Sequence, residues 1–161
     1  MKEEENYYSD SKGTKRWWHK KGDRSQLHRE DGPAFERANG HREWYTNGKL
    51  HREDGPAVEK ADGTNEWYIN DKLDRADGPA IERTDGSRLW YTNGKLHRED
   101  GPAVEYTNGF RLWYINGMRL HILTKEHLIK YMETYNLTVA HLLTDSDEVV
   151  RTSAAKYDWN E

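Results

Sequence analysis

An eight-residue motif, Leu-His-Arg-Glu-Asp-Gly-Pro-Ala, recurs along this chain and constrains its fold more than any other feature. It stands at residues 27–34, 50–57 and 96–103, and a diverged copy, Leu-Asp-Arg-Ala-Asp-Gly-Pro-Ala, occupies residues 73–80. Successive copies are 23 residues apart, and a Trp recurs with the same period. A fixed period of this length is typical of repeat arrays, in which neighbouring units bury each other's apolar faces.

Each repeat has the pattern of a β-hairpin, which residues 55–77 show best. A short alternating strand at 56–60 precedes an Asp-Gly turn at 62–63, and a return strand rich in aromatic and β-branched residues follows at 64–69. A second turn at 70–71 then leads into a connecting arm. Gly or Pro recurs too often within each repeat to leave room for a helix.

Alternation along the return strand predicts which aromatic side chains are buried. Adjacent strand residues point to opposite faces, so the Trp and the Tyr that follows it cannot both face one core. We expect the Trp column to face inward, against an apolar column from the first strand made of Phe35, Val58, Ile81 and Val104. We expect an exposed tyrosine ladder on the other face, made of Tyr45, Tyr68, Tyr91 and Tyr114.

The two ends of the chain depart from the repeat. Residues 1–12 are polar and are expected to form a flexible lead-in, so the predicted array spans residues 13–119. From residue 120 to residue 161 the composition shifts to helix formers, which predicts a helical cap. Its helices are expected to start at Thr124, near Thr138, and after Asp145 or Ser146. The expected fold is mainly β, an elongated single-layer antiparallel sheet of stacked hairpins with a small C-terminal helical cap.

Composition narrows the class of protein. Only 34% of the residues are hydrophobic, yet the chain holds seven Trp and ten Tyr, which suits a thin array that buries one aromatic layer. There is no Cys, so disulfide and thiolate chemistry are excluded. No apolar run approaches the roughly 20 residues of a membrane span, and the first residues lack the apolar core of a signal peptide. We therefore expect a soluble, cytoplasmic protein of a bacterium or an infected host cell.

The layout of residues 101–117, with Tyr106, Asn108-Gly109 and Asn116-Gly117, resembles the MORN repeat and more closely its variant form. The version that carries Leu-His-Arg-Glu-Asp-Gly-Pro-Ala resembles repeats of bacteriophage and large-virus proteins. The resemblance covers about residues 13–117. It implies stacked β-hairpins, a binding or scaffolding role, and no catalytic residues.

The third motif copy acts as a natural mutation, because Asp74 replaces the His and Ala76 replaces the Glu. The Arg and the Asp survive in all four copies, which indicates a structural role for them and makes the His and the Glu dispensable to the fold. The predicted structural residues are the repeated arginines, aspartates and tryptophans: Arg29, Asp31, Arg52, Asp54, Arg75, Asp77, Arg98, Asp100, Trp44, Trp67, Trp90 and Trp113.

One segment carries excess positive charge. Between residues 12 and 24, basic and aromatic residues alternate, a composition that suits a phosphate or a stacked base. The candidate binding residues are Lys15, Arg16, Trp18, His19, Lys20 and Lys21. The alternative is that these lysines only solvate an edge hairpin. Residues 27–118 hold 13 Lys and Arg against 17 Asp and Glu, so the array is not expected to bind duplex nucleic acid generically.

No motif in the sequence predicts catalysis, a cofactor or a metal site. We therefore expect a non-enzymatic binding or scaffold protein whose partner, most plausibly another protein, contacts the tyrosine ladder and the charged face. The alternative is a sequestering protein that holds an anionic nucleotide or another host-defence signal through the arginine columns and the basic Trp cluster. The sequence leaves the oligomeric state open.

Overall fold

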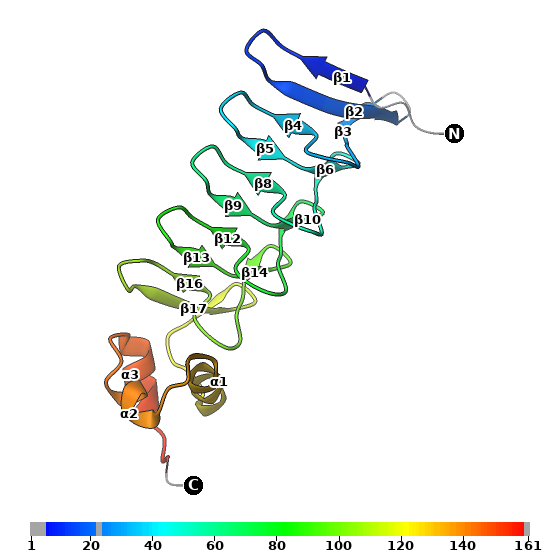
Figure 1. Cartoon of the computed structure of the whole chain (residues 1–161). Helices are drawn as coiled ribbons and strands as arrows, with labels where there is room; N and C mark the ends of the chain where they lie inside the picture. The colour runs from blue at the N-terminus through cyan, green and yellow to red at the C-terminus, as the bar shows by residue number, and fades with distance from the viewer. Residues whose placement is uncertain (1–5, 22–23, 160–161) are drawn as a thin grey trace. The chain divides into compact units, whose positions relative to one another are not determined.

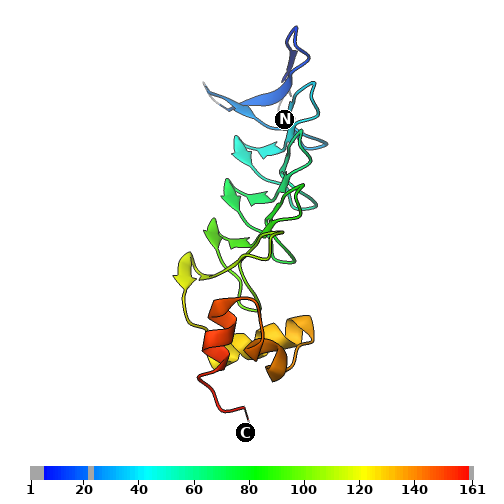
Figure 2. The ribbon, with the colours of Figure 1, turned by 90° about the vertical axis from the view of Figure 1, so that its left-hand side faces the viewer.

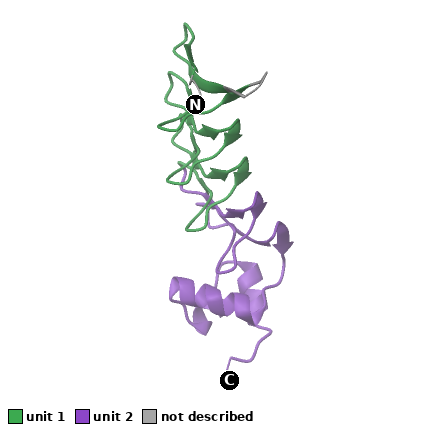
Figure 3. Ribbon diagram, turned by 90° about the vertical axis from the view of Figure 1, so that its right-hand side faces the viewer, with its two compact units in different colours: residues 1–84 green, residues 85–161 purple. Residues whose placement is uncertain are grey.

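A computed structural model describes residues 6–21 and 24–159 of the chain. It divides the chain into two compact units, Met1–Thr84 (unit 1) and Asp85–Glu161 (unit 2), shown in Figure 3. The boundary between these two units falls inside the repeats. The predicted fold class is confirmed: antiparallel hairpin repeats dominate, and short helices follow them (Figure 1).

Unit 1 is built on an antiparallel sheet whose strand order is β1-β2-β4-β5-β8-β9-β12, and β3 also pairs with β2. Figure 2 shows the hairpins following one another. The strands are β1 (Asn6–Ser9), β2 (Lys15–Lys21), β3 (Arg24–Leu27), β4 (Phe35–Glu36), β5 (Arg42–Glu43), β8 (Val58–Glu59), β9 (Asn65–Glu66) and β12 (Ile81–Glu82). Two separate two-stranded ribbons are formed by β6 (Tyr45–Thr46) with β7 (Lys49–Leu50), and by β10 (Tyr68–Ile69) with β11 (Lys72–Leu73).

Unit 2 continues the same repeat and ends in helices. Its sheet runs β13 (Arg88–Leu89), β16 (Val104–Glu105), β17 (Arg111–Ile115) and β18 (Met118–Leu120), with a ribbon of β14 (Tyr91–Thr92) and β15 (Lys95–Leu96). The helices are α1 (Lys125–Tyr135), α2 (Val139–Leu143) and α3 (Glu148–Ala154). Thr124 caps α1, as predicted, and α2 lies within the predicted helical run at residues 138–143, with Thr138 as its cap. The cap of α3 is Asp147 rather than Asp145 or Ser146. Asp147 accepts the N–H of Val149, and that contact fixes the start of α3.

The return strand of each internal repeat is broken at its Trp. The backbone N–H of Trp44 donates to the carbonyl oxygen of Ala57 (2.8 Å), and Trp67 makes the same bond to Ala80 (2.8 Å). Residues before the Trp therefore pair in the main sheet, whereas residues after it form the separate ribbon. The ribbon turns carry positive φ at both central residues, 52° at Asn47 and 77° at the Gly that follows, as tight primed turns require.

The core of the repeats differs from the predicted Trp layer. The motif alanines Ala34, Ala57 and Ala80 are fully buried in unit 1, together with Phe35 and Val58. Four of the repeat tryptophans are only half-buried: Trp17, Trp44, Trp67 and Trp90.

Trp113 alone among the repeat tryptophans is buried, at 2% exposure, because helix α1 packs against it. The Trp113 ring lies 5.2 Å from the ring of Tyr131. An inward Trp column is therefore correct only where the helices supply the second layer.

The segment expected to be a flexible lead-in contains β1, which pairs with β2 and places the ring of Tyr7 5.0 Å from that of Trp17. The Tyr7 side chain itself is 55% exposed. An additional strand therefore precedes the first repeat in unit 1.

Candidate functional site

The most distinctive surface features are the arms, the four segments that carry the motif: arm 1 (residues 27–33), arm 2 (50–56) and arm 3 (73–79) in unit 1, and arm 4 (96–102) in unit 2. Backbone hydrogen bonds hold arms 1 and 2 against the repeat that follows each of them in unit 1, and they hold arm 4 in the same way within unit 2. The N–H of Arg52 donates to the carbonyl oxygen of Tyr68 (3.2 Å), and the N–H of Asp71 donates to that of Leu50 (2.9 Å). The arms are therefore ordered, although they lack regular secondary structure over most of their length.

In each arm, the motif Arg stacks on a Trp ring and donates hydrogen bonds to the motif Asp and to the carbonyl oxygen of the motif Pro. We term this set of contacts the arginine clamp. In arm 3, the guanidinium carbon of Arg75 lies 3.9 Å from the ring centroid of Trp67. Its Nε donates to Asp77 (2.9 Å), and its Nη1 donates to the carbonyl oxygen of Pro79 (3.2 Å) and to Glu82 (2.9 Å). The distance from the guanidinium carbon to the centroid of the Trp ring is 4.2 Å in arm 1, 4.1 Å in arm 2 and 4.0 Å in arm 4. The clamp gives the repeated Arg, Asp and Trp one shared set of contacts.

The motif glycine lies directly beneath the clamp. A Cβ atom at Gly55 would lie 2.8 Å from Cζ of Arg52, too close for any real contact. At Gly101 the same distance to Arg98 would be 2.9 Å. The glycine is needed here for space rather than for a left-handed backbone, since these motif glycines do not have positive φ.

Two of the three motif histidines, His28 and His97, also have a structural contact, which comparison of the motif copies did not predict. Nδ1 of His28 accepts the backbone N–H of Asn47 (3.2 Å), and Nδ1 of His97 accepts that of Asn116 (3.1 Å). These two histidines thus support the Asn-Gly turns of the repeats that follow them. The His is therefore less dispensable to the fold than the sequence suggested.

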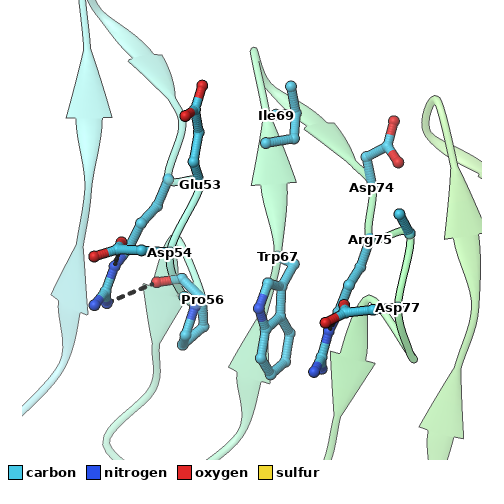
Figure 4. A pocket seen from close by; sticks show the side chains of 11 residues that line it. Glu53, Asp54, Pro56, Trp67, Ile69, Asp74, Arg75 and Asp77 are labelled. Atoms are coloured by element: carbon cyan, nitrogen blue, oxygen red, sulfur yellow. Dashed lines mark hydrogen bonds and ion pairs between the residues drawn. The ribbon is translucent and has the colours of Figure 1, made fainter.

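Two consecutive grooves open between the arms of unit 1. The groove between arms 2 and 3 has a volume of about 720 Å³. Its lining comprises Arg52, Glu53, Asp54, Gly55, Pro56, Trp67, Ile69, Asp74, Arg75, Ala76 and Asp77. Figure 4 shows Trp67 standing between the side chains of arm 2 and those of arm 3, with Arg75 beside its ring. The groove between arms 1 and 2 has a volume of about 670 Å³ and places Trp44 in the same role.

The grooves are acidic. Four carboxylates and two guanidiniums line the groove between arms 2 and 3, a formal excess of two negative charges. Three of these carboxylates are accessible, because the side chains of Glu53, Asp54 and Asp77 are 86%, 85% and 83% exposed. Hydrogen bonds from the clamp arginines lower the pKa of Asp31, Asp54 and Asp77, so all three are anionic at neutral pH.

The arginines of the grooves are not free to bind an anion. Arg52 donates to Asp54 (2.8 Å) and to Glu59 (3.4 Å), so two carboxylates neutralise one guanidinium. The clamp arginine of arm 3, Arg75, has the two equivalent acidic partners, Asp77 and Glu82. Phosphate recognition depends on cations that the protein itself leaves uncompensated. These contacts disfavour anion binding by the arginine columns.

The tyrosine ladder is less exposed than expected. Tyr45, Tyr68, Tyr91 and Tyr114 are all half-buried. The hydroxyl of Tyr45 donates to Glu43 (2.8 Å), and burial together with this carboxylate raises the pKa of Tyr45. These phenols are embedded in the ribbons and present little free surface.

The structure places the described residues of the predicted basic cluster in different surroundings. Lys15 lies 3.5 Å from Glu36, and Arg16 lies 3.8 Å from Asp10. Trp18 is half-buried, whereas His19 is 1% exposed and its ring lies 4.3 Å from that of His28. Lys20 and Lys21 belong to β2, but their side chains lie outside the described residues. Lys15 and Arg16 therefore both have carboxylate neighbours.

No protein-family model, curated protein or solved structure matches this chain. Among the described residues, no group of three or more His, Cys, Asp or Glu side chains is arranged to hold a metal ion. Across that same part of the chain, no helix has the length and apolar character needed to cross a bilayer.

Proposed function

We propose that this chain is a non-enzymatic repeat-type binding protein whose partner is another protein, recognised along the charged edge formed by the arms of unit 1. The proposal rests on one observation. Two grooves lined by the same residue types lie between successive arms of unit 1. A surface that repeats with the chain suits an extended macromolecule, whereas a catalytic site departs from the repeat at one place. The arm edge replaces the tyrosine ladder as the recognition face, because the tyrosines are half-buried.

Two further points support the proposal. The resemblance to MORN-variant repeats implies a binding or scaffolding role. The arms are also held by backbone bonds and clamps, so their exposed side chains are already positioned before binding, and preorganisation of this kind lowers the entropic cost of association.

The proposal is tested by selecting binders from a displayed library of random peptides on the immobilised full chain. The selected peptides are then measured on two double variants that each lose two exposed carboxylates. Glu30→Gln with Glu53→Gln removes them from the arms, and Glu126→Gln with Glu133→Gln removes them from α1 as the matched control. Both variants are expected to keep the melting temperature of the parent, since exposed substitutions change stability little.

We expect the arm variant to lose peptide binding and the α1 variant to retain it. A library that yields no binders, or binders that tolerate the arm variant as well as the control, would contradict the proposal. A nucleotide that raises the melting temperature while no peptide is selected would favour the sequestering function instead.

A further inference from the structure

We infer that the two grooves between successive arms of unit 1 bind the cationic side chains of a basic, extended polypeptide segment, one Lys or Arg side chain in each groove. This inference rests on the proposed function and names the chemistry of the partner. It depends on three observations: the lining of the grooves, a lysine of this chain that already contacts an arm, and the spacing of the sheet.

The lining combines the two features that recognise an organic cation. The Trp67 ring supplies an aromatic surface, and Glu53, Asp54, Asp74 and Asp77 supply carboxylates around it. A cation over an indole face is stabilised by the ring quadrupole, and more strongly where water is partly excluded. Arg75 in the clamp shows that this ring accepts a guanidinium at 3.9 Å. The excess negative charge of the groove selects a cation over an anion or an apolar side chain.

Arm 4 shows such a contact within the chain itself. Nζ of Lys130, on α1, donates to Glu99 (3.1 Å), which holds the motif position of Glu30 and Glu53. The ring of Tyr135, also on α1, lies 5.7 Å from the guanidinium carbon of Arg98. The helix thus covers arm 4 with a lysine and an aromatic ring. In unit 1, the equivalent glutamate of arm 2 is 86% exposed, against 62% for Glu99.

The distance between the two grooves determines how far apart the Lys or Arg residues of the bound segment must lie. Trp44 follows β5 and Trp67 follows β9, and the sheet order β5-β8-β9 separates them by two strand intervals. Strands lie about 4.8 Å apart, so the grooves are roughly 9.6 Å apart. A polyproline II segment rises about 3.1 Å per residue and repeats its face every third residue, which brings positions i and i+3 about 9.3 Å apart on one side. A β-strand would turn residue i+3 to the opposite face.

The test uses fluorescently labelled, proline-rich peptides and the full chain, with binding followed by anisotropy. One peptide carries two Arg at positions i and i+3, a second carries them at i and i+2, and a third carries two Glu at i and i+3. We expect the i, i+3 arginine peptide to bind about fivefold more tightly than the i, i+2 peptide, because the latter engages one groove only. The Glu peptide is expected to bind most weakly.

Variants of the groove provide the second measurement. Glu53 lines both grooves, and Glu53→Gln is expected to weaken the i, i+3 arginine peptide about two- to fivefold, whereas Glu133→Gln on α1 leaves it unchanged. Ala76 is exposed in the lining between arms 2 and 3, and Ala76→Glu is expected to strengthen binding by a similar factor. None of these exposed positions belongs to a clamp, so folding is not at risk.

Equal binding of the i, i+3 and i, i+2 arginine peptides would overturn the inference, as would tighter binding of the Glu peptide or insensitivity to Glu53→Gln. If the library yields peptides that depend on the arms but do not carry paired Lys or Arg residues, the cationic inference is refuted and the proposed function still stands. Absence of any arm-dependent binder would refute both.

Discussion

Replacing the clamp arginine of arm 3 tests the contact on which the arms depend. Arg75→Ala removes the stack on Trp67 at 3.9 Å, the hydrogen bond to the carbonyl oxygen of Pro79 at 3.2 Å and the ion pair with Glu82 at 2.9 Å. The side chain of Arg75 is 21% exposed, so these contacts are partly shielded from water.

The expected loss in the free energy of unfolding is obtained by adding the contributions of these contacts. The stack contributes about 1–2 kcal/mol in a partly desolvated site. The bond to the carbonyl oxygen contributes about 1 kcal/mol net. The pair with Glu82, whose side chain is 40% exposed, contributes less than about 1 kcal/mol. Arg75→Ala is therefore expected to cost about 2–4 kcal/mol, whereas Arg75→Lys, which keeps the charge and loses the planar fork, is expected to cost about half as much.

The assay is urea unfolding followed both by far-ultraviolet circular dichroism and by Trp fluorescence, since repeat arrays need not unfold in two states. The matched control is Arg83→Ala, because Arg83 is exposed, and its expected effect is within about 0.5 kcal/mol. If Arg75→Ala were no more destabilising than Arg83→Ala, the clamp would not stabilise the arm. If Arg75→Lys were silent while Arg75→Ala was costly, charge rather than planar stacking would be the cause.

Three further predictions concern the motif. Gly55→Ala is expected to cost about 1–2 kcal/mol in urea unfolding, because its Cβ would lie 2.8 Å from Cζ of Arg52 and displace the guanidinium. His97→Ala is expected to cost about 0.5–1.5 kcal/mol in the same assay, since the N–H of Asn116 loses its acceptor at 3.1 Å. The pKa of Asp54 is lowered in the folded chain from 3.8, so its contribution is present above that value and is lost as the pH falls through the folded pKa. Urea unfolding of Asp54→Asn should accordingly show a shallower loss of stability below about pH 4 than the parent.

The elements that depend on local chemistry were predictable from the sequence. The Asn-Gly pairs require positive φ, and the structure gives Asn93 and Gly94 φ values of 51° and 77°. Thr124 and Thr138 precede helix-forming residues and cap the helices that follow them. In each case the short-range pattern and the fold agree, so no tertiary contact had to be known.

The face assignment of the aromatic residues was not predictable, for a physical reason. The alternation rule assumes a continuous strand, but the chain changes sheets at Trp44, whose N–H bonds to Ala57 in the next repeat. Beyond such a break the inward and outward faces are no longer related, and Trp44 and Tyr45 are both half-buried. The stacking of the Arg on the Trp was equally hidden, because the Trp precedes the Arg by eight residues and a shared 23-residue period does not show that the two side chains touch.

The lining of the grooves explains the two substitutions in the diverged arm 3. Its two substitutions, Asp74 for His and Ala76 for Glu, look like independent losses in the sequence. In the structure they lie in the same groove, where Asp74 adds one carboxylate and Ala76 removes one. The groove between arms 2 and 3 therefore keeps four carboxylates against two guanidiniums, the same formal balance as the groove between arms 1 and 2 with its histidines neutral. The clamp residues do not change, since they stabilise the arm itself. The positions that vary are those on which the clamp does not depend, and they vary in a way that preserves the charge offered to a cation.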